Sequence, residues 1–344
     1  MNQAADSTPH QPAAAVSATI RALRFDGANV RLEANHALPE PAPGEAVIRT
    51  TKAAVSATDL EVCKGLFEFV GTLGHEFVGV VESMNDDSRP ELRGKRVVGT
   101  VSAVCGQCDM CQGGLSGHCR QRTVLGMQGR DGCLADSLLL PVKNLVVVPD
   151  SVDDDHAVFA HSVASAIQAA RQLTIEGRPY ITVLGDGPLG LITAQVMVKL
   201  NASVRLVGRY SEKLALCEKW GVKHRHVDDI GRRADQDIVV DCTGSPAGLD
   251  LATELVRPRG TILVKTLLST KADAISTVSL TPVVVNELTV LGSGFGPVAE
   301  AVSMLAQGEV DVISLISKRM SLASGPAIVQ AASQPGVIKV LVDP

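Results

Sequence analysis

Short apolar runs separated by glycine and proline fill the chain up to about residue 149. Their length and valine-rich composition are typical of β-strands, so this half is predicted to be mostly β. The runs lie at residues 45–50, 76–83, 95–101, 136–142 and 145–150. The residues before Thr19 are rich in alanine, glutamine, serine and proline, and we expect residues 1–18 to form a disordered tail.

The pattern changes between residues 150 and 165. Beyond this point, long alanine- and leucine-rich segments that predict helices alternate with strand-like bursts at residues 181–185, 203–208, 237–244 and 261–266. This alternation is typical of βαβ units, so the pattern predicts an α/β fold with a parallel sheet. An amphipathic helix is expected at residues 299–312, and a helix followed by a final strand within 324–344.

The composition excludes several classes of function. The chain has 32 basic and 37 acidic residues, a net charge of −5, and no evident cluster of lysine and arginine. Only 6 Phe, 2 Tyr and 1 Trp are available for base stacking, so nucleic acid is not an expected partner. No apolar run reaches the roughly 18–20 residues that span a bilayer, so no membrane association is expected. Eight cysteines without a secretion signal indicate a reducing compartment, with the cytoplasm as the expected location.

Four cysteines follow a spacing that is typical of metal ligands. Cys105, Cys108, Cys111 and Cys119 stand as C-x2-C-x2-C-x7-C. Two-residue gaps allow successive thiolates to turn toward one centre, and four sulfur ligands fill a tetrahedral zinc site without an open position. We therefore predict a structural zinc ion. An iron–sulfur cluster uses similar runs, and four incidental thiols are the remaining alternative.

A glycine-rich loop follows the strand-like run at residues 181–184. Gly185, Gly187 and Gly190 form G-x-G-x-x-G, with Pro188 and Leu189 inside the motif, and an apolar helix is expected to begin there. Such glycines permit a tight turn and a close approach of the backbone to a pyrophosphate, which the helix N-terminus binds. Because strand, loop, helix and second strand occur in order, the sequence predicts a dinucleotide site.

The end of the second strand bears on the choice between NAD and NADP. An NAD site usually has an acidic residue there to bind the ribose 2′-hydroxyl, but this chain has Gly208 and Arg209. The missing carboxylate removes repulsion of a 2′-phosphate, and a guanidinium can pair with it, so NADP is favoured. Alternatively, Arg209 stacks on adenine and both cofactors are accepted.

Together these motifs resemble the medium-chain, zinc-dependent alcohol dehydrogenase superfamily, and within it a group of uncertain substrate. The resemblance rests on GHEFVGVVE from Gly74, the four cysteines, the GDGPLG loop, and the segment DCTGSPAGLDLATELVRPRGTILV. It implies a GroES-like, β-rich catalytic domain of residues 19–162 and 295–344. A Rossmann domain with a doubly wound parallel sheet would comprise residues 163–294, with the active site between the domains. It also implies a homodimer or tetramer formed through sheet edges near 261–266 and 288–294.

The resemblance places a catalytic zinc site at positions that this chain has partly changed. The family's ligands are a cysteine two residues before Thr or Ser, the histidine of GHE, and a cysteine or acidic residue at the start of the interdomain helix. Only His75 is intact; Ser56 and His161 occupy the other two positions, while Thr58 and Asp59 are retained. A serine hydroxyl is a poor zinc ligand, whereas a neutral histidine is a good one.

Two interpretations of the catalytic centre therefore stay open. In the first, His75, His161 and Glu76 hold a metal ion, together with Ser56 or water, and Thr58 relays the proton. In the second, the site is free of metal and Thr58, His75 and His161 polarise a carbonyl by hydrogen bonding. Either interpretation predicts interconversion of an alcohol and an aldehyde or ketone. The rival hypothesis is a degenerate homologue that binds the nucleotide without turnover and acts as a sensor or assembly subunit.

Three further positions are assigned by the same resemblance. Lys339 matches a basic residue that reaches the cofactor pyrophosphate in relatives, with an ordinary surface lysine as the alternative. Phe67 and Phe69 follow a turn where relatives line the substrate pocket, which favours an apolar substrate.

Overall fold

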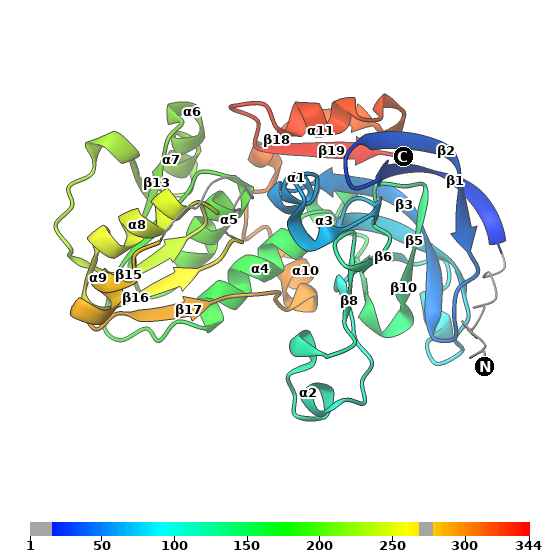
Figure 1. The fold of residues 1–344 in the computed structure, drawn as a ribbon, viewed down its shortest axis with the longest axis horizontal. Helices are drawn as coiled ribbons and strands as arrows, with labels where there is room; N and C mark the ends of the chain where they lie inside the picture. The colour runs from blue at the N-terminus through cyan, green and yellow to red at the C-terminus, as the bar shows by residue number, and fades with distance from the viewer. Residues whose placement is uncertain (1–15, 268–277) are drawn as a thin grey trace, which may run out of the picture.

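The computed structural model describes residues 16–267 and 278–344, which form two lobes that lie side by side (Figure 1). Residues 1–15, most of the predicted tail, and 268–277 lie outside this description, and strand β1 already begins at Val16. One lobe is built of largely antiparallel sheets, and the other is a parallel sheet covered by helices. The predicted α/β fold with a β-rich first part is confirmed.

The antiparallel lobe contains three sheets. The largest has the order β11-β6-β5-β3-β19-β18, with β10 also paired to β3. Its strands are β3 (Glu45–Val55), β5 (Glu76–Met84), β6 (Arg96–Gly99), β10 (Ser137–Pro141), β11 (Leu145–Val147), β18 (Ile316–Ser321) and β19 (Lys339–Asp343). A second sheet pairs β1 (Val16–Phe25) with β2 (Val30–Pro39) and β4 (Gly71–Thr72), and a third contains β7 (Ser102–Ala103), β8 (Thr123–Leu125) and β9 (Gly129–Arg130).

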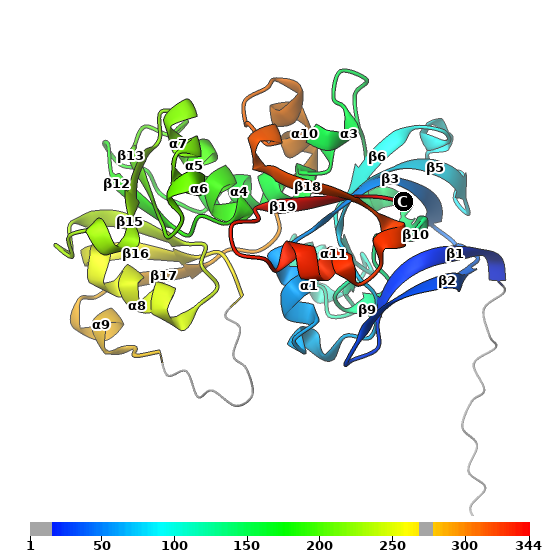
Figure 2. The ribbon, with the colours of Figure 1, turned by 90° about the horizontal axis from the view of Figure 1, so that it is seen from above.

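Short helices connect these strands, and the C-terminal segment returns to this lobe. The helices are α1 (Ala57–Val62), α2 (Asp109–Gln112), α3 (Asp154–Ala157) and α11 (Ala327–Ala332). Figure 2 shows α11 and β19 beside α1 and β1 of the first half of the chain. Because β19 pairs with β3, the C-terminus belongs to the sheet whose strand β3 leads into Ser56.

The second lobe is a six-stranded, all-parallel sheet in the order β14-β13-β12-β15-β16-β17, which is the Rossmann arrangement. The strands are β12 (Tyr180–Leu184), β13 (Ser203–Gly208), β14 (Lys223–His226), β15 (Gln236–Asp241), β16 (Val256–Val264) and β17 (Thr289–Gly292). Its helices are α5 (Pro188–Met197), α6 (Ser211–Leu214), α7 (Leu216–Lys219), α8 (Pro246–Leu255) and α9 (Thr281–Val285). No helix in the two described ranges is long and apolar enough to cross a membrane.

Helices α4 (Ala160–Arg171) and α10 (Val298–Ala306) lie between the lobes (Figure 1). One apolar core crosses this boundary, because Ala54 and Val78 of the antiparallel sheet belong to the same cluster as Val163 of α4 and Ile181 of β12. A continuous close-packed core holds neighbouring elements in a fixed relation. The first turn of α4, which carries His161, is thereby positioned beside the end of β3 and the start of β5.

Candidate active site

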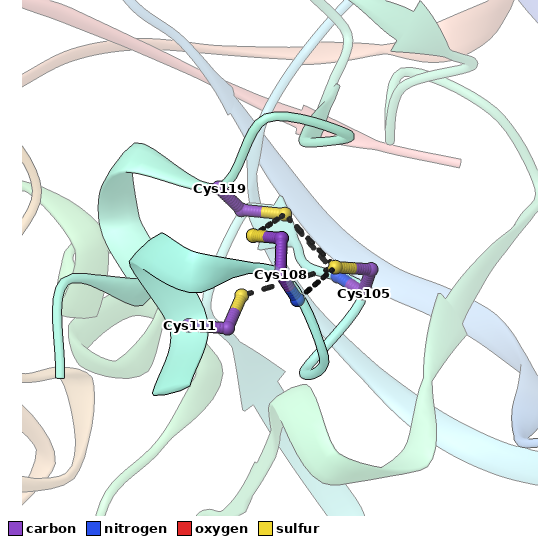
Figure 3. Close-up of side chains that lie close together, drawn as sticks. All are labelled: Cys105, Cys108, Cys111 and Cys119. Atoms are coloured by element: carbon purple, nitrogen blue, oxygen red, sulfur yellow. Dashed lines mark hydrogen bonds between the residues drawn. The ribbon is translucent and has the colours of Figure 1, made fainter. Parts of the chain in front are cut away.

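The four predicted zinc ligands converge in one loop of the antiparallel lobe (Figure 3). Sulfur–sulfur distances are 3.5 Å for Cys105–Cys119, 3.8 Å for Cys108–Cys119 and 4.0 Å for Cys105–Cys111. A tetrahedron with Zn–S bonds of about 2.3 Å has edges of about 3.8 Å, so these cysteines fit a zinc ion. Backbone N–H groups of Arg120 and Cys111 lower the pKa of Cys108 to about 6, which favours the thiolate that zinc requires.

We expect Cys108→Ser to lose its zinc, because a protonated hydroxyl cannot replace one of four thiolates. Zinc retention during dialysis against a chelator should fall by roughly 10-fold or more, since removing a direct ligand costs at least as much as removing an outer-shell partner. Elemental mass spectrometry measures this loss. Cys63→Ser is the matched control, because Cys63 lies outside the quartet, and unchanged zinc in the Cys108 variant would contradict the assignment.

The glycine loop fits a dinucleotide pyrophosphate. Gly185 has a φ of +107°, and a Cβ at Gly190 would lie 1.9 Å from the Gly185 carbonyl oxygen, so neither position accepts a side chain without strain. A Cβ at Gly187 would meet nothing within 4 Å, so the loop is open on that side. Helix α5 starts at Pro188, and its N-cap has no side-chain hydrogen bond, which leaves backbone N–H groups near Leu189 for a phosphate.

A carboxylate with no role predicted from the sequence lies against the end of β13. Asp186, from inside the glycine loop, accepts hydrogen bonds from the backbone N–H groups of Arg209 (2.7 Å) and Tyr210 (2.8 Å). Gly208 is required there, because a Cβ would lie 2.6 Å from the Asp186 side chain. The side chain of Arg209 is exposed, and the ion pairs of the described residues do not include it. Its guanidinium is therefore free to meet a ligand.

A hydrogen-bonded triad lies at the boundary between the lobes and consists of Ser56, His75 and Asp59. His75 Nδ1 lies 2.9 Å from Asp59 Oδ1, and His75 Nε2 lies 3.3 Å from Ser56 Oγ. Ser56 is the N-cap of α1, where its Oγ accepts the backbone N–H of Thr58 and of Asp59. The order hydroxyl, imidazole, carboxylate can move a proton to or from the hydroxyl. Thr58, in the first turn of α1 beside this triad, is partly exposed.

The charges around His75 favour its protonated form. Burial alone would lower the pKa of His75, but the adjacent Asp59 carboxylate outweighs it and holds that pKa above its ordinary value. The imidazolium is therefore populated at higher pH than for a free histidine, and Asp59 fixes its orientation. This arrangement can hold a proton at Nε2 and pass it toward Ser56 Oγ.

Glu76 is engaged by two buried partners. Lys339 Nζ lies 2.5 Å from Glu76 Oε2, and the Ser162 hydroxyl donates to Glu76 Oε1 at 2.5 Å. Lys339 is 1% exposed and Glu76 is 2% exposed, so the alternative of a surface lysine is excluded. The ammonium is directed to Glu76 and is enclosed by protein, which does not match the predicted contact with a pyrophosphate. Neither partner was identified from sequence, because both are distant from Glu76 along the chain.

His161 stands opposite His75. Their ring centroids are 5.2 Å apart in an edge-to-face arrangement, and the Phe295 ring lies 5.7 Å from that of His161. Although His161 is partly exposed, burial by the surrounding protein and the positive charge of His75 lower its pKa to about 3. His161 is therefore a neutral imidazole.

Phe67 is 47% exposed with a φ of +67°, whereas Phe69 is 5% exposed and belongs to the core.

The donor set at the second predicted metal position does not fit a catalytic zinc ion. Among residues 16–267 and 278–344, only the four cysteines form a group of metal-ligand side chains whose ligand atoms all lie within 4.8 Å. His75, Glu76 and His161 do not form such a group. Both Glu76 oxygens are engaged, and the Ser56 hydroxyl stays protonated near neutral pH and faces His75.

Comparison with known proteins gives the same architecture. The alcohol dehydrogenase GroES-like domain matches residues 42–150, and the zinc-binding dehydrogenase domain matches residues 188–308. An L-threonine 3-dehydrogenase of Chelativorans sp. (strain BNC1) is 27% identical over 304 residues, which cover 83% of this chain and 87% of that protein.

Two solved structures superpose over nearly the whole chain. A zinc-binding dehydrogenase from Sinorhizobium meliloti 1021 bound to NADP has a TM-score of 0.84 at 27% identity, covering 95% of this chain and 100% of its own. An alcohol dehydrogenase from E. coli CFT073 complexed with NADH has a TM-score of 0.83 at 20% identity over 95% and 100% of the two chains, which supports the fold alone. The chain therefore belongs to the medium-chain zinc alcohol dehydrogenase family and is a zinc-type, NAD(P)-dependent dehydrogenase.

Proposed function

We propose that the protein interconverts an alcohol and an aldehyde or ketone by hydride transfer, and that a hydroxyl–imidazole relay handles the substrate oxygen in place of a second metal ion. One observation carries this proposal: the chain from Ser56 Oγ through His75 to Asp59, with contacts of 3.3 and 2.9 Å. The family supports the hydride chemistry, and the donor set described above supports the absence of a second zinc ion.

When bound, the nicotinamide supplies or accepts the hydride. The residues of this chain act on the oxygen and its proton. The Ser56 and Thr58 hydroxyls would donate hydrogen bonds to a carbonyl oxygen and so polarise it. His75 would replace the proton that leaves Ser56, and Asp59 would stabilise the imidazolium. Because Asp59 raises the pKa of His75, the relay keeps its proton to higher pH than a free histidine would, which favours reduction of the carbonyl.

The test combines a metal count with turnover. Protein purified without chelator should contain one zinc ion per chain by elemental mass spectrometry, and it should oxidise NADPH in the presence of some member of an aldehyde and ketone panel. Two zinc ions per chain would overturn the relay and restore a site at His75 and His161. Cofactor binding without turnover on any alcohol or carbonyl would overturn the oxidoreductase and favour the binding-only homologue.

We propose NADPH as the preferred cofactor, supported by the exposed guanidinium of Arg209 and by one relative solved with NADP. Arg209→Ala should weaken NADPH binding by roughly 10-fold or more, because hydrogen bonds to charged groups contribute about 1.5–3 kcal/mol, and should leave NADH nearly unchanged. Fluorescence titration gives both dissociation constants. Arg225→Ala, an exposed arginine on β14, is the control. Equal affinities of the wild type for NADPH and NADH would reject the preference.

We also propose a homodimer formed along β17, which is an edge strand of the parallel sheet. Val290 on β17 and Leu280, Val284 and Val285 at α9 are 45–76% exposed, an apolar patch of the kind that marks interfaces. Val284→Asp should shift the sedimenting species from dimer to monomer in analytical ultracentrifugation, because an interface would bury the new charge without a partner. A wild-type protein that sediments as a monomer at micromolar concentration would contradict this proposal.

A further inference from the structure

Lys265 is a buried cation without a described anionic partner. It follows directly after β16, at the carboxyl edge of the parallel sheet, and is 7% exposed. Its ammonium donates to the Gly294 carbonyl oxygen at 2.6 Å and to the Ser293 carbonyl oxygen and hydroxyl at 3.2 Å each. These acceptors are all neutral, and the ion pairs found among residues 16–267 and 278–344 do not include Lys265. A cation removed from water is costly unless an opposite charge compensates it.

This ammonium lies beside the candidate active site. The segment that accepts its hydrogen bonds, Ser293–Gly294, leads into Phe295, whose ring lies 5.7 Å from that of His161. The charge of Lys265 is also one of those that lower the pKa of His161. In parallel α/β sheets, ligands bind outside the carboxyl ends of the strands, which is where Lys265 stands.

Of the three buried cations His75, Lys339 and Lys265, only Lys265 has no carboxylate partner among the described residues. His75 is balanced by Asp59 at 2.9 Å, and Lys339 is balanced by Glu76 at 2.5 Å. His161 is neutral and adds no charge. The neighbouring hydroxyl of Thr266 is also buried without a hydrogen-bond partner among the described residues.

We propose that Lys265 binds a carboxylate of the substrate, so that the enzyme acts on hydroxy acids and their oxo-acid counterparts. This inference rests on the proposed function and specifies its substrate class. The alternative anion, the cofactor pyrophosphate, belongs at the loop after β12, and β15 separates β12 from β16 in the sheet. Phe295, directly after Gly294, and Leu267, two residues after Lys265, are 40% and 50% exposed and offer apolar surface for the carbon chain.

The test uses matched pairs that differ only in charge. Lactate and lactamide, and 4-hydroxybutanoate and 4-hydroxybutanamide, are titrated by calorimetry into full-length protein saturated with NADPH. In at least one of these pairs, the carboxylate should bind to the wild type roughly 10-fold tighter than the matching amide, because a charge-assisted hydrogen bond is stronger than a neutral one. Lys265→Met should reduce this ratio to near one, and Lys265→Arg should retain most of it. Lys199→Met, which removes a cation paired with Glu309 elsewhere, should leave the ratio unchanged.

Folding of each variant is checked by its NADPH affinity and its thermal midpoint. Equal binding of carboxylates and amides to the wild type, or a preference that survives in Lys265→Met, would overturn the proposal. Weaker NADPH binding with an unchanged ratio would assign Lys265 to the cofactor and would also overturn it. Turnover separates the proposed oxidoreductase function from the proposed carboxylate site. If the protein oxidises NADPH with neutral aldehydes alone, the function is kept and the carboxylate site is rejected. A carboxylate preference without any turnover keeps the site and rejects the oxidoreductase.

Discussion

Lys339→Met is expected to lower the free energy of unfolding by about 3–5 kcal/mol, because it leaves the buried Glu76 carboxylate without its cation. Lys339 is 1% exposed and Glu76 is 2% exposed, and their charged atoms lie 2.5 Å apart, so water cannot replace the lost partner. Urea denaturation followed by circular dichroism measures the change.

A double variant separates the pair from its surroundings. Lys339→Met with Glu76→Gln removes both charges, and it should recover a large part of the loss, since a neutral buried pair carries no uncompensated charge. The control is Lys64→Met, which breaks an ion pair between Lys64, 50% exposed, and Glu61, and should cost less than about 1 kcal/mol. A Lys339→Met variant as stable as this control would contradict the expectation.

The same pair predicts an acid-labile fold. Burial opposes ionisation of Glu76, but the positive charges of Lys339 and His75 and the hydrogen bond from Lys339 outweigh it and lower the pKa of Glu76 to about 2. A carboxyl whose pKa is lower in the folded than in the unfolded chain contributes stability above its ordinary pKa of about 4.3. That contribution should disappear as the pH falls from about 4.5 toward 2, and Glu76→Gln should lack this part of the pH dependence.

Local patterns were sufficient to predict the elements that carry the two recognised motifs. The run at residues 203–208 is β13, and the G-x-G-x-x-G loop joins β12 to α5. The strands β1 and β2 were not predicted. Most positions of β2 are exposed or half-buried, and β2 lacks an apolar run. The amphipathic helix expected at residues 299–312 ends at Ala306 as α10, close to Gly308, whose φ is +65°.

The partners within the candidate site could not be predicted, since they come from distant parts of the chain. Glu76 and Lys339 are 263 residues apart, and Glu76 and Ser162 are 86 apart. No local pattern encodes such contacts; they follow from β19 pairing with β3 and from α4 packing against the same sheet. Lys265 did carry a local signal, because a lysine directly after a buried apolar strand is rarely buried unless its ammonium is paired.

Asp59→Asn is expected to reduce kcat for carbonyl reduction by roughly 10²–10⁴-fold, the range that positioned acid–base groups contribute. The amide keeps the size of the carboxylate, but it cannot stabilise the imidazolium of His75, whose Nδ1 lies 2.9 Å away. The substrate-binding surface is not altered, so KM should change much less than kcat. Steady-state kinetics with NADPH and the best carbonyl substrate give both constants.

The pH profile distinguishes a proton relay from a purely structural role of Asp59. Burial lowers the pKa of His75 and Asp59 raises it, with a net increase in the wild type. Reduction needs the protonated imidazole, so kcat should fall as the pH rises through this pKa, and in Asp59→Asn the fall should occur at lower pH. Glu61→Gln, on the same helix but paired with the exposed Lys64, should retain the wild-type profile. If kcat of Asp59→Asn fell without any displacement of the profile, His75 would not be the proton donor, and Asp59 would only hold α1 in place.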